Sequence, residues 1–72
     1  MNSTQLRQVG QALYGPRWIG GLASAVGYHR RSVVRWMAGE SPIPRIVGVD
    51  LCKVMAEKIA LLEAIGKEIT EG

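Results

Sequence analysis

The chain contains few of the residues on which covalent and metal-based chemistry depends. Its 72 residues include one cysteine, Cys52, and one histidine, His29. An internal disulfide is therefore impossible, no Cys/His cluster can hold zinc, and a reducing environment is expected. His29 has no serine or cysteine partner at an interpretable spacing, and Cys52 falls on an apolar segment where we expect it to be packed. With no glycine-rich phosphate loop either, the sequence predicts no enzyme, no metal site and no cofactor.

Acidic residues are missing from the first half of the chain. Before Glu40 the only permanently charged side chains are five arginines, whereas from Glu40 onward six acids stand against four bases. The net charge of +3 thus combines a strongly basic half with a slightly acidic one. This distribution favours a surface that binds a polyanion, with a merely solvated basic face as the alternative.

Long hydrophobic runs are also missing. The uncharged segment between Arg17 and Arg30 has about half of the roughly 20 residues that span a bilayer. The N-terminus lacks the basic stretch and apolar run of a secretory signal. We therefore expect a soluble, cytoplasmic protein that makes no use of a membrane.

The apolar residues that are present follow helical spacing, without the alternation typical of β-strands. A first helix is expected to be capped by Asn2, Ser3 or Thr4, with Gln5 placed to close a capping box on Asn2. Pro16 ends that helix together with the glycine before it. Proline also fits the first turn of a second helix, which is expected to run to about residue 26.

A third helix and a long last helix are expected in the rest of the chain. The third runs from Arg30 to Met37 with His29 at its cap, and a loop with two prolines follows. The last helix covers about residues 45–69, unless it breaks near Gly48 into two. At about 1.5 Å per residue it extends nearly 40 Å, which a core of three short helices cannot cover. Its distal apolar residues therefore fold back or, as we favour, pair with another chain; they are Leu61, Leu62, Ile65 and Ile69.

Residues 19–38 have the spacing of two short amphipathic helices joined by a tight turn. Ala23 is small enough to let the helices cross closely, and Gly27 gives the turn its backbone freedom. Trp18 is expected in the core rather than as a stacking platform. The other apolar positions on the two facing surfaces are Leu22, Val26, Val33 and Trp36.

The segment from Leu13 to Leu51 resembles the Cro/C1-type helix-turn-helix of phage and bacterial repressors, the lambda-repressor-like family. The matching positions are Leu22, Ala23, Gly27, Val33, Trp36 and Gly39 with the Pro-Ile-Pro that follows. The chain departs from the family at Trp18-Ile19, where a glutamine often opens the first helix of the motif, and at His29, where serine or threonine often caps the second. The resemblance implies an all-α, four- to five-helix, lambda-repressor-like domain over residues 1–72. It also implies a bacterial or phage-encoded protein associated with the nucleoid.

The resemblance implies that the second helix of the motif lies in the DNA major groove. Arg30 and Arg31 can reach guanine O6 and N7 in bidentate geometry, with phosphate binding alone as the alternative, and Val34 can meet a thymine methyl. Arg17 and the free amides at the start of the second helix form an anion site. The remaining expected contacts, to phosphates or flanking bases, are Ser32, Arg35, Arg45 and, unless its side chain caps the helix, His29.

The sequence therefore predicts a sequence-specific DNA-binding transcriptional regulator. We expect a homodimer on double-stranded DNA, with two recognition helices in successive major grooves about 34 Å apart. Repression by occlusion is favoured because no effector domain or cofactor site accompanies the motif. The alternative is a protein-interaction module, antiactivator or antitoxin-like, that binds a protein partner through the apolar last helix. RNA binding is a weaker third option, because the sequence offers no clear aromatic platform for stacking bases.

Overall fold

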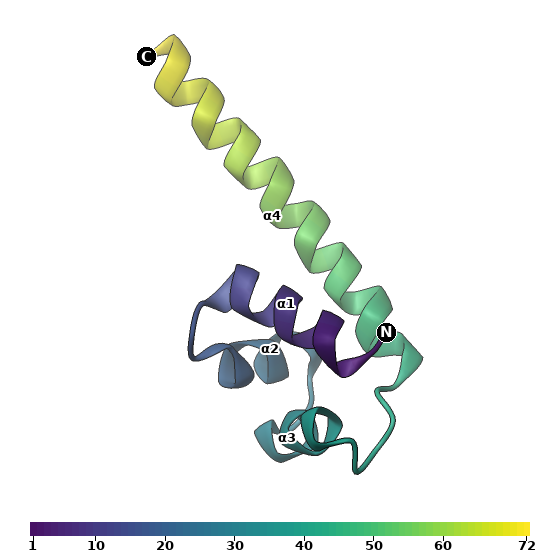
Figure 1. Ribbon diagram of the computed structural model, residues 1–72. Coiled ribbons are helices and arrows are strands. Elements are labelled where there is room, and N and C mark those ends of the chain that lie inside the picture. Colours follow the sequence, from purple (N-terminus) through teal and green to yellow (C-terminus); the bar gives the residue numbers. More distant parts are fainter.

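Four α-helices make up the structure, a computed structural model that describes residues 1–72 (Figure 1). Their bounds are α1 (Ser3–Tyr14), α2 (Trp18–Val26), α3 (Arg30–Ala38) and α4 (Arg45–Glu71). The first three helices and the start of α4 enclose the core, while the rest of α4 extends away from it, giving overall dimensions of 49 × 22 × 19 Å. The predicted all-helical architecture with a long last helix is confirmed, and α4 runs through Gly48 without a break.

The start of α1 is fixed by a capping box between Asn2 and Gln5. The Asn2 Oδ1 atom accepts a hydrogen bond from the Gln5 amide at 2.8 Å, and Gln5 Oε1 accepts one from the Asn2 amide at 3.0 Å. Two amides that the helix itself cannot bond are thereby satisfied. The expected capping box is confirmed, with Asn2 as the N-cap.

Replacement of the cap should weaken the fold measurably. We expect Asn2→Ala to lower the free energy of unfolding by about 0.5–2 kcal/mol, because the Gln5 amide loses its partner. Thr4→Ala is the matched control, since Thr4 is exposed and its side chain makes no hydrogen bond. Urea unfolding followed by circular dichroism measures both; equal midpoints for the two variants would contradict the capping argument.

The connection from α1 to α2 differs from the expectation. Pro16 lies in a turn before α2 and not in its first helical turn, so that prediction is wrong. Gly15 leaves α1 with φ 78°, and the next two residues complete the reversal that brings Trp18 into the core. Arg17 consequently becomes the N-cap residue of α2.

The helices end as the sequence predicts, at Gly27 for α2 and Gly39 for α3. Their φ angles are 72° and 76°, in the left-handed region that glycine enters without steric cost. Each cap amide donates back into the last turn of its helix. The turn between α2 and α3 is therefore short and well defined.

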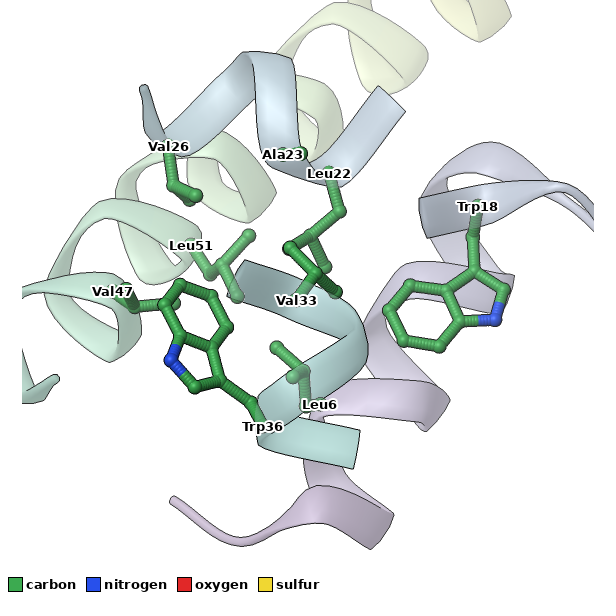
Figure 2. Packing of buried hydrophobic residues seen from close by; sticks show 9 residues of the cluster. All are labelled: Leu6, Trp18, Leu22, Ala23, Val26, Val33, Trp36, Val47 and Leu51. Carbon is green, nitrogen blue, oxygen red and sulfur yellow. The ribbon is translucent and has the colours of Figure 1, made fainter. Parts of the chain in front are cut away.

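The core is a single apolar cluster drawn from all four helices (Figure 2). Figure 2 shows the indoles of Trp18 and Trp36 on opposite sides of a group of aliphatic side chains. The positions expected to join α2 and α3 are buried, which confirms that part of the sequence analysis. The nine buried residues are Leu6, Trp18, Leu22, Ala23, Val26, Val33, Trp36, Val47 and Leu51.

Two glycines mark places where helix α1 and its neighbours touch closely. A Cβ atom on Gly10 would overlap the six-membered ring of Trp18, so the indole packs directly on the α1 backbone. A Cβ atom on Gly21 would lie 3.0 Å from the Tyr14 ring. The adjacent Gly20 faces open space, so only the second glycine of this pair is explained by close helix packing.

Helix α4 leaves the core after two turns. Val47 and Leu51 are fully buried, but every residue from Ala56 onward is exposed. Cys52 is exposed as well, so the expectation that it is packed is wrong: it follows Leu51 and turns away from the core. None of the helices combines the length and apolar character needed to cross a membrane.

Candidate functional site

The outward face of α3 is the most basic part of the molecule. Val33 and Trp36 attach α3 to the core, so the opposite face of the helix points to solvent. Arg30, Arg31 and Arg35 are exposed on it. Val34 is 47% exposed and lies one turn from the first two arginines. The helix thus presents an apolar spot bordered by guanidinium groups.

Five residues at the start of α3 enclose a polar hollow of about 410 Å³. His29 stands at the N-cap, but its side chain makes no capping hydrogen bond, so the expectation that its imidazole caps the helix is wrong. Its backbone carbonyl occupies the helix start instead, accepting from the Ser32 amide at 2.9 Å. The imidazole is left available at the rim. The hollow is lined by His29, Arg30, Arg31, Ser32 and Arg35.

A second hollow, of about 360 Å³, joins the start of α2 to the start of α3. Arg17 and Arg30 line it from the two elements, together with Pro16 and Ile19. No side chain caps α2, and the amides of its first residues, from Trp18 on, have no hydrogen-bond partner. Free amides at a helix start and two guanidinium groups attract an anion. The anion site predicted around Arg17 therefore gains a second arginine, from α3.

The side-chain hydrogen-bond donors of these hollows have no partner within the molecule. The side-chain hydrogen bonds of the molecule join Asn2 with Gln5 and Thr70 with the Gly66 carbonyl, and none involves an arginine. The nearest acid along the chain is Glu40, beyond the far end of α3. Because each guanidinium offers five donors and no acceptor, the face can bind an anionic or acceptor-rich partner at several points.

Arg45 does not join the other predicted contact residues. It begins α4 and lines a third concavity, the α1–α4 groove, a hollow of about 870 Å³ between α1 and the first turns of α4. This groove exists because α4 packs mainly on α2 and touches α1 little. The structure thus brings together seven of the eight predicted DNA-binding residues around the start and outer face of α3, with Arg45 apart.

Tyr28 is a feature of this site that the sequence analysis left without a role. Its ring packs edge-on against Trp36, with centroids 5.0 Å apart and planes at 70°. The side chain is 37% exposed and its hydroxyl has no hydrogen-bond partner in the molecule. The packing holds the turn before His29 against the core, and the hydroxyl remains a free donor. The only sign of this packing in the sequence is that an aromatic residue directly follows the turn glycine, Gly27.

The acidic and metal-binding side chains of the molecule form no comparable cluster. No three of its His, Cys, Asp or Glu residues are grouped as metal ligands would be. Comparison of the chain with protein-family models, curated proteins and solved structures gives no significant match. A functional assignment therefore depends on the residues and geometry described above.

Proposed function

We propose that the chain is a DNA-binding transcriptional regulator with a lambda-repressor-like helix-turn-helix, in which α3 is the recognition helix. The observation that carries the proposal is the solvent-facing side of α3, where Arg30, Arg31 and Arg35 surround Val34 with no acid nearby. Duplex DNA is the common polyanion whose groove accepts a helix of this kind.

The N-terminal half of α3 has the chemistry needed to read base edges. Recognition helices contact bases with their first residues, and here those are Arg30 and Arg31. Bidentate arginine contacts to guanine O6 and N7 are the commonest specific contact, and an apolar side chain such as Val34 meets the thymine methyl. This combination supports recognition of sequence as well as of charge.

The two hollows would hold the DNA backbone on either side of the recognition helix. Arg17 and the free amides of α2 offer one phosphate site, and His29 with Ser32 and Arg35 offers another. Such contacts fix the position of the helix in the groove. A homodimer would repeat them in a second half-site about one turn, or about 34 Å, away. Binding there would repress by occluding a promoter.

A salt titration tests the proposal. Duplex fragments selected from genomic DNA by binding are labelled, and affinity is measured by fluorescence anisotropy between about 50 and 200 mM salt. With about six phosphate contacts per protomer, the plot of log affinity against log salt should fall with a slope near −5 for each protomer bound. Unrelated duplexes should bind more weakly with a slope of similar size. Absent binding, or a flat response, would refute DNA recognition.

A protein-interaction module is the second candidate, favoured by the exposed apolar residues of distal α4, of which Ile69 is 75% exposed. The two functions use different surfaces. A protein partner held by α4 would be lost on replacement of Ile65 and Ile69 and retained on replacement of Arg30 and Arg31. DNA binding, in contrast, would be lost on replacement of Arg30 and Arg31.

A further inference from the structure

The distal part of α4 has an apolar face that nothing in the chain covers. We call residues 59–71 the α4 tip. Leu62 is 66% exposed, Ile65 43% and Ile69 75%, and the three recur at helical spacing. Their spacing from the buried Leu51 places them on the same side of α4, in the part of the helix that is exposed all round. A monomer leaves this apolar face in water, which is unfavourable.

The same chain offers a concave surface of matching character, the α1–α4 groove. The floor of the groove is apolar and is formed by α4, whose side chains there are short: Gly48, Val49, Cys52 and Ala56. Val9 lines the opposite wall from α1, together with the polar Gln5 and Gln8. Arg45 and Lys53 are the charged residues of its lining, and no acid is among them. The groove thus has an apolar floor, a partly polar α1 wall and a cationic rim.

The α4 tip matches the groove in length and in charge. Its 13 residues extend about 20 Å, close to the length of α1, which forms one wall. The tip carries Glu63, Glu68 and Glu71 against a single base, Lys67. Its helix C-terminus adds negative partial charge, whereas the start of α4 beside Arg45 is the positive end. Tip and groove therefore attract when two helices lie antiparallel.

We propose that the groove binds the α4 tip of a second copy of this chain, reciprocally, so that two α4 helices cross antiparallel. The proposal rests on the self-association included in the proposed function, but not on DNA binding. Leu62, Ile65 and Ile69 of one copy cover the apolar floor of the other. Each copy thereby buries the surface that the other leaves exposed, as a two-fold interface requires.

A parallel pairing of the same helices is disfavoured by charge. It would set Lys58, which interrupts the apolar face between Met55 and Leu62, against the Lys58 of the second copy. It would also bring Glu68 and Glu71 beside the same residues of their partner. Like charges opposed in this way oppose binding, and the α1–α4 groove would stay empty.

The antiparallel arrangement fixes which residues face each other. Placing Leu62 over Ala56 and Ile69 over Val49 puts Ile59 on the two-fold axis and Gly66 opposite Cys52. The two Cys52 residues then lie about 21 Å apart along the helices, far beyond the roughly 7 Å Cα separation that a disulfide can bridge. The only cysteine of the chain can thus report the register.

Disulfide trapping in the absence of DNA tests the proposal with the full chain. Gly66 faces open space, so Gly66→Cys should leave the fold intact, which circular dichroism checks. On mild oxidation this variant should run as a covalent dimer on a non-reducing gel. The original chain should stay unlinked, and so should the matched control Cys52→Ser/Gly66→Cys. Linkage in the control would mean parallel pairing, and no linkage in any variant would mean that the tip does not dock; either outcome overturns the proposal.

A charge exchange supplies an independent readout. Lys53 would face Ile65 of the second copy, with Glu68 of that copy one turn further on. Because the dimer would hold two such exposed contacts, Lys53→Glu should weaken dimerisation about 3- to 10-fold in sedimentation equilibrium, and adding Glu68→Lys should restore it; no rescue would overturn the proposed contact. Salt-dependent DNA binding by a chain that fails both tests would overturn the docking alone. A trapped dimer without DNA binding would overturn the proposed function alone.

Discussion

One methyl group at Gly10 is expected to destabilise the fold, while the same methyl group at Gly20 stabilises it. The Cβ of Gly10→Ala would overlap the buried indole of Trp18. Overpacking of this kind costs about 1–3 kcal/mol. Gly20 also lies in a helix but meets nothing within 4 Å, so Gly20→Ala should gain up to about 1 kcal/mol from helix propensity.

Thermal unfolding of the two variants measures the difference. Each kcal/mol shifts the Tm of a domain this size by about 4–8 °C, so the two alanine variants should melt on opposite sides of the original protein. Near-ultraviolet circular dichroism should change only for Gly10→Ala, because only there does a tryptophan ring move. A Gly10→Ala variant at least as stable as the original would mean that Trp18 does not pack on α1.

Removal of Arg30 and Arg31 together is expected to abolish specific DNA binding. Each bidentate contact to guanine is worth about 1–3 kcal/mol of discrimination, so the double alanine variant should lose roughly 30- to 25,000-fold in affinity for its selected duplex. Affinity for unrelated duplexes should fall far less. Both side chains are exposed and outside the core, so stability should not change.

The control lowers the net charge by two elsewhere. Thr4→Glu/Gln11→Glu changes the net charge equally, but both residues are exposed on α1, outside α3, the two hollows and the α1–α4 groove. Its affinity should stay close to that of the original protein. An equal loss in the two double variants would indicate general charge attraction, and a uniform loss over all duplexes would indicate phosphate contacts only.

Features set by neighbours along the chain could be predicted from the sequence. The capping box links residues three positions apart, Asn2 and Gln5, so its signal is local. Gly27 and Gly39 end their helices through a local requirement for positive φ. The buried face of α2 and α3 follows from helical periodicity, which places Val33 and Trp36 on one side and the arginines on the other.

Features that depend on how distant helices cross could not be predicted. The sequence marks Gly10 as a weak helix residue but does not say that Trp18 will lie on it. The position of Cys52 and Arg45 depends on α4 packing against α2 and leaving a groove beside α1. In the same way, the second hollow joins Arg17 to Arg30 only because α2 and α3 begin near each other.

The projecting half of α4 is the least stable part of the helix, and its local stability can depend on protein concentration. Beyond Ala56 the helix has no tertiary support, and an isolated helical segment of about 15 residues is only marginally stable in water. Its backbone therefore opens to hydrogen exchange at a far lower free energy than the core does. If a second molecule docks on this segment, the contact raises that free energy, and the folded fraction of the segment then rises with protein concentration.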